Sequence, residues 1–292
     1  MSPAEQRFWM LAQRRAAGLQ PDLHRAILRA FQIIRDSLSE ADLERLVTSG
    51  QLERVLTDVL SDAVMDRAFL PVRDRIRQTT QAGFRYAVPS LPHGGKVDGV
   101  LAVMFDQLNP HVVVAITTLE TRVITSLQAD IREAVRTIVR ANLEAGHSAS
   151  VSARQIRPII GMSPTQVENS LKYEAKLREQ GMADAQVEKA VSAYRKKAVA
   201  LNAETNAGTA TKDAYKRGQQ LAWQDAVDKG IVDGARLKKQ WLGIMDNRER
   251  PTHVAMEKET VPYDQPYSNG QMVPGDTEYN CRCISRFFVA AA

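Results

Sequence analysis

One long apolar stripe limits this chain to folds that can hold long helices. Between residues 110 and 146, apolar side chains recur at steps of three or four: Ile116, Leu119, Val123, Leu127, Ile131, Val135 and Ile138. That spacing puts them on one face of an α-helix. Asn109 and Pro110 signal its start, and Gly146 its end. A helix of about 32 residues spans roughly 48 Å, which is typical of a bundle member rather than the wall of a compact active site.

Composition favours the same fold class. Of 292 residues, 44% are hydrophobic and only 6% are aromatic. The abundant residues, Ala, Arg, Gln and Leu, favour helices, whereas the scarce aromatic residues favour strands. Residues 1 to about 87 also carry helical apolar stripes, with Gly50 as a break between two of them. We therefore predict a mainly α protein with an elongated body of long helices.

Two further signals in the helical part predict a loop and a new helix start. The segment 88–97, VPSLPHGGKV, contains two prolines and a glycine pair, so we predict an exposed loop there. Ser163 and Pro164 predict a new helix start, with Gln166 placed to close a capping box. We expect this helix to run to about Gln180.

The region from residue 172 to 217 supports two expectations. A stripe of small residues indicates a helix face that packs inside a bundle, because small side chains let helices approach closely; its members are Ala203, Ala207, Ala210 and Ala214. The same region has ten Lys or Arg against six Asp or Glu, most densely at Arg195, Lys196 and Lys197. This charge is typical of a solvated helix surface, and the functional alternative is a face that contacts DNA phosphates.

Charge and hydropathy exclude little. Lys and Arg exceed Asp and Glu by 39 to 34, a net charge of +5, which permits contact with nucleic acid or an acidic partner without arguing for either. We see no unbroken run of about 18 apolar residues and so predict no membrane-spanning helix. The opening stretch does not resemble a secretory signal. Two cysteines spaced as C-x-C cannot join distant segments, so we expect a reducing cytoplasm.

The composition of the sequence changes near residue 235. Gly, Pro, Asn and Asp become frequent, and CRCISRFFVA predicts a closing β-strand. We therefore divide the chain into an N-terminal helical region, residues 1–100, a long-helix body, residues 101–235, and a small α+β domain, residues 236–292.

The C-terminal domain gathers residue types that bind metals. Cys281 and Cys283 are two residues apart, and on an extended strand such residues face the same way, so both sulfurs could address one ion. His253 lies upstream in RPTHVAM, which can start a short helix. Zinc accepts Cys, His and carboxylate ligands in a tetrahedral set. The candidate oxygen ligands are Asp246, Glu249 and Asp276.

Simpler interpretations compete with a metal site. The cysteines can be buried apolar residues, His253 can hydrogen-bond a turn, and Asp276 can cap one. A cysteine nucleophile with His253 as its base is a further alternative. No protease signature, P-loop, dinucleotide-binding motif or H-E-x-x-H motif accompanies these residues. The residues alone leave these alternatives open.

The order of residues in this domain resembles the C-terminal domain of phage head-morphogenesis proteins, typified by the Mu F-like minor head proteins of tailed phages. The family pattern reads W…D…R-x-R-x-x-H…G…P-G-D…N-C-R-C. The matching residues are Trp241, Asp246, Arg248, Arg250, Thr252, His253, Met256, Asn269, Gly270, Pro274, Gly275, Asp276, Asn280, Cys281, Arg282 and Cys283. The likeness is specific over about residues 236–285, looser over 110–235 and absent before about residue 100.

The resemblance implies a structural protein of the virion and no enzyme. Such minor head proteins are assembled in the bacterial cytoplasm, associate with the portal vertex of the capsid and assist head assembly. The implied partners are the portal protein and the major capsid protein or a scaffold. Double-stranded DNA is a further candidate partner, through contact with the packaged genome or a role in ejection, and no membrane is implied.

The resemblance also strengthens the metal hypothesis. It implies one structural zinc held by His253, Cys281, Cys283 and Asp276, with no other cofactor. Two alternative functions stay open at this point. One is a metal-dependent hydrolase or nuclease that uses the C-terminal His/Cys/Asp cluster, and the other is a DNA-binding accessory protein.

Overall fold

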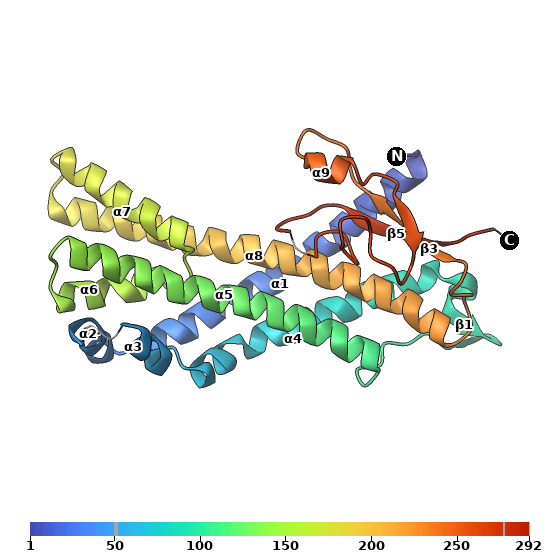
Figure 1. Cartoon of the computed structure of the whole chain (residues 1–292), viewed down its shortest axis with the longest axis horizontal. Helices are drawn as coiled ribbons and strands as arrows, with labels where there is room; N and C mark the ends of the chain where they lie inside the picture. Colours follow the sequence, from blue (N-terminus) through green and yellow to red (C-terminus); the bar gives the residue numbers. More distant parts are fainter. Residues whose placement is uncertain (50–51, 277, 292) are drawn as a thin grey trace. The chain divides into compact units, whose positions relative to one another are not determined.

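The computed structural model describes residues 1–49, 52–276 and 278–291, and within this part helices predominate (Figure 1). The predicted break at Gly50 lies outside the described residues. The α-helices are α1 (Pro3–Ser37), α2 (Glu40–Thr48), α3 (Leu52–Val59), α4 (Asp62–Ala87), α5 (Pro110–Glu144), α6 (Ala149–Ile156), α7 (Pro164–Glu179), α8 (Asp184–Asp228) and α9 (Pro251–Val254). Three short 3₁₀ turns connect them: η1 (Val88–Ser90), η2 (Pro92–Gly95) and η3 (Arg157–Ile159).

Strands are few and short. β1 (Lys96–Val97) and β2 (Val100–Leu101) form a small hairpin. In the C-terminal part, β3 (Leu237–Leu242) is the central strand of an antiparallel sheet, between β4 (Thr260–Pro262) and β5 (Ile284–Val289). The prediction of a mainly α protein with a small C-terminal α+β part is confirmed.

The described chain forms two compact units that do not follow one another in sequence. We call Met1–Leu23, Asp74–Thr121 and Ala207–Ala292 the sheet unit, and His24–Arg73 and Arg122–Asn206 the helical unit. This division differs from the three consecutive regions expected from the sequence. The reason is that α1, α4, α5 and α8 are long enough for each to contribute residues to both units.

The predicted helix starts and the predicted helix end at Gly146 agree with the structure. Asn109 accepts a hydrogen bond from the backbone N–H of His111 at 2.9 Å, and α5 ends two residues before Gly146. Ser163 and Gln166 form the predicted capping box of α7. Contrary to the expectation from the sequence, α5 is long and apolar enough, by length and composition alone, to cross a membrane. Of its most apolar stretch of 18 residues, 33% is buried.

Close helix packing in the sheet unit depends on glycines in α4 and α8. A Cβ on Gly218 would lie 2.0 Å from the carbonyl oxygen of Thr80, and a Cβ on Gly83 would lie 2.1 Å from that of Tyr215. Only glycine lets the two backbones approach this closely. The predicted small-residue stripe on α8 is also buried, as Ala207, Ala210 and Ala214 are at most 1% exposed.

The segment 88–97 is only partly the exposed loop that was predicted. His93 is exposed, with a left-handed backbone at φ 51°. Leu91, however, is 4% exposed and belongs to a hydrophobic cluster of the sheet unit that includes Phe84 and Trp223. The turn-forming prolines end the helix, while the leucine between them reaches the core.

Candidate metal centre

Three segments of the sheet unit bring the candidate ligands together. Pro251 occupies the first turn of α9, where its missing N–H is not needed, and the one-turn helix presents His253. Glu249 lies in the loop just before this helix. Cys281 and Cys283 immediately precede β5 and do not lie within it. Their sulfurs nevertheless face the same site, because the chain is already extended toward the strand.

The ligand atoms converge on the imidazole of His253. Its Nδ1 lies 3.7 Å from Cys281 Sγ, 3.5 Å from Cys283 Sγ and 3.5 Å from Glu249 Oε1. Cys283 Sγ donates a hydrogen bond to Glu249 Oε1 at 2.9 Å. Ligand atoms of the histidine and both cysteines all lie within 4.8 Å of one another, so this buried group could hold a metal ion.

These separations match those of a tetrahedral zinc shell. With Zn–S about 2.3 Å and Zn–N or Zn–O about 2.0–2.1 Å, tetrahedral angles place S and N roughly 3.6 Å apart, and N and O roughly 3.4 Å apart. The distances from His253 to the two sulfurs and to Glu249 agree with both values. The sulfur–oxygen contact of 2.9 Å is shorter, because here a thiol proton joins the two atoms.

The other side of the imidazole faces a carboxylate. His253 Nε2 lies 2.9 Å from Glu278 Oε2, although the two atoms are not aligned for a hydrogen bond. Gln271 Nε2 donates to the other Glu278 oxygen at 3.3 Å. Metal-ligating histidines commonly donate their second ring N–H to such a carboxylate, which fixes the tautomer and the ring orientation.

The two thiols titrate as a coupled pair. The neighbouring Cys283 side chain lowers the pKa of Cys281 to about 5, against the opposing effect of burial, and the positive charge of Lys216 adds to this shift. The pKa of Cys283 is raised because it is hydrogen-bonded to Cys281, is buried and lies beside Glu249. One thiolate is therefore favoured in the protein without a metal. The thiolate is the form of cysteine that binds a metal.

Distant parts of the sheet unit hold the C-R-C segment in place. Trp9 Nε1 and Gln13 Nε2, both from α1, each donate to the carbonyl oxygen of Arg282 at 2.9 Å, and Figure 1 shows the N-terminal end of α1 beside the sheet. From α8, Lys216 Nζ donates to the carbonyl oxygens of Pro274 at 2.7 Å and Cys281 at 3.2 Å. These contacts set the position of the sulfurs through the backbone.

Two of the candidate oxygen ligands have other partners. Asp276, the predicted fourth ligand, accepts the backbone N–H groups of Met272 and Val273 and forms an ion pair with Arg217 at 2.6 Å. It caps a turn, as the simpler interpretation proposed, because the P-G-D turn directs its carboxylate back to its own loop. Asp246 instead pairs with Arg282 at 2.5 and 2.7 Å, and this arginine lowers the pKa of Asp246 to about 2. Glu249 provides the carboxylate at the centre.

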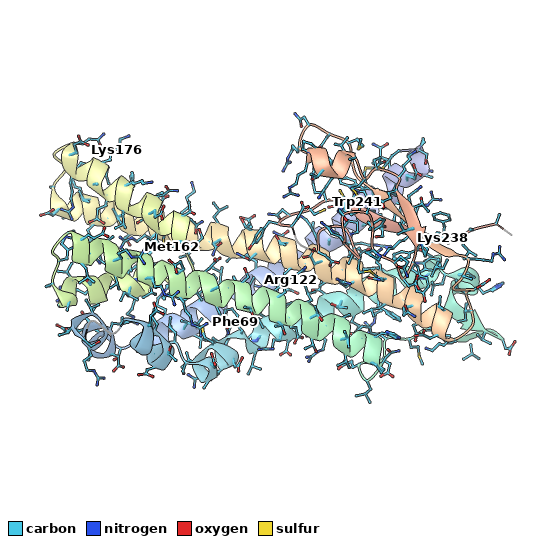
Figure 2. All side chains as sticks on the ribbon, in the orientation of Figure 1. Phe69, Arg122, Met162, Lys176, Lys238 and Trp241 are labelled. Carbon is cyan, nitrogen blue, oxygen red and sulfur yellow. The ribbon has the colours of Figure 1, made fainter. Side chains whose placement is uncertain are left out.

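Aromatic and turn residues of the motif surround the cluster. Trp241 lies on β3 within the C-terminal part (Figure 2), fully buried, with its ring edge-on to those of His253 at 5.2 Å and Tyr267 at 5.1 Å. Gly275 has φ 94°, and a Cβ there would lie 2.7 Å from Cys281 Cβ. Asn280 also adopts a left-handed conformation, and its N–H donates to Thr209 of α8.

The remaining motif residues support the loops around the centre. Arg250 donates to the carbonyl oxygen of Tyr279 at 2.7 Å and pairs with Glu278 at 3.2 Å. The N–H of the exposed Arg248 donates to Asp246. Gly270 has φ 79° in a turn where the Asn269 side chain accepts a hydrogen bond from Gln271.

The predicted DNA-contacting residues are not equivalent. Arg195 is buried, donates to Ser170 Oγ at 2.8 Å and pairs with Glu174 at 3.5 Å, so its prediction as a surface contact is wrong. It lies one helical turn from Val191 and Val199, which are also buried, and therefore belongs to the inward face of α8. Lys196 and Lys197 are exposed.

Sequence reasoning missed two groups of supporting residues. Glu278 follows no spacing rule relative to His253. Trp9 and Gln13 lie about 270 residues away in the chain, and their hydrogen bonds to Arg282 leave no local signal. Comparisons with protein-family models, curated proteins and solved structures give no match. The resemblance to head-morphogenesis proteins therefore stays a prediction that depends on the residues of the C-terminal motif.

Proposed function

We propose that this chain is a minor structural protein of a tailed-phage head, and that one structural zinc ion stabilises its C-terminal part. The observation that carries the proposal is the buried group of four donor side chains. Its members are His253, Cys281, Cys283 and Glu249, of which the first three belong to the family-like motif and Glu249 lies within the R-x-R-x-x-H stretch.

The donor set fits a structural site better than a catalytic one. Structural zinc has four protein ligands, whereas catalytic zinc keeps one position for water or substrate. Nδ1 of His253, the two sulfurs and Oε1 of Glu249 supply four donors, and the three distances from Nδ1 to the others suit a tetrahedral shell. The side chains of His253 and Glu249 are 1% and 3% exposed. This burial and the complete donor set count against the alternative of a metal-dependent hydrolase.

Zinc would also relieve unfavourable electrostatics. Glu249 Oε2 is buried without a hydrogen-bond partner in the described part of the chain, and its nearest cation, Arg282, lies 3.9 Å away. A divalent cation would compensate the carboxylate and the thiolates, and would strengthen the attraction between the imidazole and the Glu278 carboxylate 2.9 Å away. The zinc ion would join α9 and the loop before it to the segment that leads into β5. In a sheet of three short strands, such a link contributes directly to folding.

The role in the phage head is supported by how the motif residues are used. Trp241 packs against His253, a Cβ on Gly275 would meet Cys281, Arg282 lies 3.9 Å from Glu249, and Asn280 fixes the loop before Cys281 to α8. Motif residues that serve to build a small domain suit a protein that acts by binding other proteins. We propose the portal protein as its main partner, with a place at the portal vertex inside the virion.

The zinc proposal is tested by elemental analysis of the intact protein purified under reducing conditions. We expect about one zinc per chain, as one four-ligand site predicts. His253→Ala, Cys281→Ser and Glu249→Gln should lose it, while His93→Ala, which changes an exposed histidine, should retain it. A metal-free protein whose stability is the same in wild type and His253→Ala would overturn the zinc proposal.

The head role is tested separately by co-expression with the portal protein and with the major capsid protein of the same phage. We expect the chain to co-purify with the portal protein and to be found in assembled heads at low copy number. Failure to associate with portal, capsid or scaffold protein, by a folded and zinc-loaded chain, would refute this role and leave the metal result intact.

A further inference from the structure

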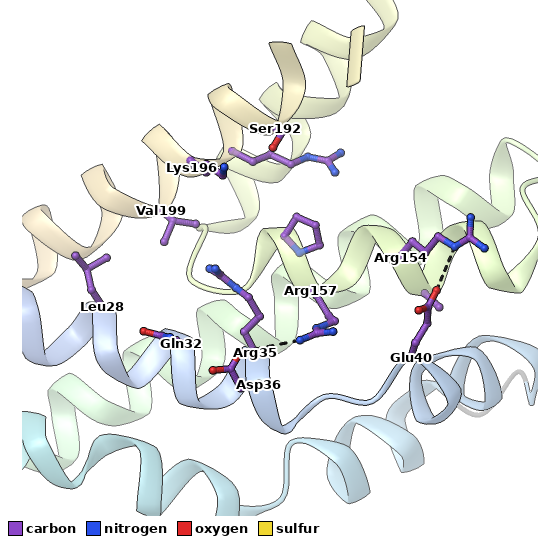
Figure 3. Close-up of a pocket in the computed structure, with 13 residues that line it drawn as sticks. Leu28, Gln32, Arg35, Asp36, Glu40, Arg154, Arg157, Ser192, Lys196 and Val199 are labelled. Carbon is purple, nitrogen blue, oxygen red and sulfur yellow. Dashed lines mark hydrogen bonds and ion pairs between the residues drawn. The ribbon is translucent and has the colours of Figure 1, made fainter. Parts of the chain in front are cut away.

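The helical unit contains a basic pocket that is separate from the metal centre. Its volume is about 650 Å³, and its lining comes from α1, α6, η3 and α8 together with Glu40 at the start of α2 (Figure 3). This volume lies within the range of small-molecule sites, about 300–1,000 Å³. An apolar wall, which includes Leu28 and Val199, faces the charged residues.

Positive charge dominates the lining. Its cationic members are Arg35, Arg154, Arg157, Arg195 and Lys196, and its acidic members are Asp36 and Glu40. Arg154 pairs with Glu40 at 3.1 Å and Arg157 with Asp36 at 4.0 Å, so both carboxylates are already engaged. Within the described part of the chain, neither Arg35 nor Lys196 has a carboxylate within 4.0 Å.

Arg35 is the least satisfied of these groups. Figure 3 shows its side chain reaching from α1 into the space between Arg157 and the α8 residues Lys196 and Val199. Its Nη2 makes only a long hydrogen bond, 3.4 Å, to the carbonyl oxygen of Ile160. Its Nε is buried without a hydrogen-bond partner among the described residues. A buried guanidinium nitrogen without an acceptor is unfavourable, so the Arg35 side chain is short of hydrogen-bond acceptors.

Arg195 adds buried positive charge beside the same space. Its side chain is 8% exposed, and burial lowers its pKa, with the charge of Glu174 opposing the shift only in part. Arg195 is paired, as Arg154 and Arg157 are, so among the described residues the positive charge left without a carboxylate in the lining is that of Arg35 and Lys196.

We propose that this pocket binds a phosphate group. A carboxylate has two oxygens and one charge, which a single guanidinium can satisfy. A phosphate has more acceptor oxygens and up to two charges, and several guanidinium groups can share them in bidentate geometry. The unpaired Arg35 and Lys196, with three further arginines around the same concave space, fit the second ligand. The phosphate can belong to a small phosphorylated molecule or to a nucleic-acid backbone.

The placement of the basic residues supplies a matched pair of variants. Lys196 lines the pocket, whereas its neighbour Lys197 is exposed and does not. Lys196→Gln and Lys197→Gln therefore remove the same charge from adjacent positions of one helix. Arg35→Gln removes the unpartnered guanidinium, and circular dichroism with a thermal melt verifies that each variant is folded.

The experiment is a calorimetric titration of the intact chain with pyrophosphate and with inorganic phosphate. We expect saturable binding, weakened at least about tenfold by Lys196→Gln and by Arg35→Gln, since hydrogen bonds to charged groups contribute that much, and unchanged in Lys197→Gln. Lys196 is exposed, so its variant stays informative if Arg35→Gln fails to fold.

A duplex oligonucleotide distinguishes the two phosphate sources. Binding that pyrophosphate displaces and that Lys196→Gln weakens assigns the phosphate to nucleic acid, whereas binding of pyrophosphate alone assigns it to a small ligand. The proposal is overturned if the folded wild-type chain shows no saturable binding of any of these probes. It is also overturned if Lys197→Gln loses as much affinity as Lys196→Gln, or if an acidic peptide displaces the phosphate probes at lower concentration.

Discussion

Gly275→Ala tests whether the P-G-D turn positions the metal ligands. Gly275 has φ 94°, a backbone conformation that side chains rarely adopt. A Cβ at this position would lie 2.7 Å from Cys281 Cβ and 3.2 Å from Lys216 Nζ. The first atom is fixed to the backbone of the C-R-C segment, so the segment itself must move. The lysine nitrogen is the end of a flexible chain, but it is also held by two carbonyl oxygens.

The expected loss of stability has two parts. Forcing a residue with a side chain into the left-handed region costs about 1–2 kcal/mol, and overpacking a closely packed site costs about 1–3 kcal/mol. Together they predict a loss of about 2–5 kcal/mol. Gly270→Ala is the matched control, because Gly270 has φ 79° with nothing within 4 Å of its would-be Cβ. The control should show only the first part, about 1–2 kcal/mol.

Urea denaturation of both variants, with zinc and with a chelator, measures the difference. We expect Gly275→Ala to be less stable than Gly270→Ala in each condition. Because its Cβ displaces the cysteine segment, it should also weaken zinc binding by about tenfold or more, as changes next to metal ligands do. Equal stability and equal zinc affinity for the two variants would refute the reasoning that the turn holds Cys281 in place.

Three further predictions concern the same unit. Trp241→Ala should destabilise the protein by about 3–5 kcal/mol in denaturant titrations, since it empties a fully buried site against His253. Gly218→Ala should disrupt the packing of α4 on α8, seen as a lower melting temperature, whereas Gly18→Ala, in α1 with nothing within 4 Å, should raise stability by about 0.5–1 kcal/mol. Asp246 has its pKa lowered to about 2 from 3.8, so the stability it contributes is present above pH 3.8 and is lost as the pH falls toward 2. Asp246→Asn should therefore flatten the acid limb of the stability curve over that window.

The helix starts were the part of the fold that the sequence predicted best. The starts of α5 and α7 were predicted correctly because a cap depends on residues within one turn of each other, such as Ser163 and Gln166. The burial of Leu91 was not predictable in the same way. Its partners come from α4 and α8, and no pattern within the turn reports a neighbour so far away in sequence.

The candidate site also has residues that local sequence signals predicted and residues that they did not. Residue type and spacing pointed to His253, Cys281 and Cys283, which lie together in the structure. The carboxylate beside His253 is Glu249 and not the predicted Asp276, because the two side chains are of the same chemical type and only the path of the loops distinguishes them. Likewise, three adjacent basic residues looked alike, yet the helix turns Arg195 inward and leaves Lys197 in solvent.

The sequence by itself determined the long helices, their caps, the late β-leaning segment and the identity of three candidate ligands. All of these depend on interactions between residues a few positions apart or on the chemistry of a single side chain. The tertiary structure alone decided which carboxylate lies beside His253, why Gly275 and Gly218 must lack a side chain, and which cations surround the pocket. Each of these depends on distances between segments that are far apart in the chain, and such distances exist only once the chain has folded.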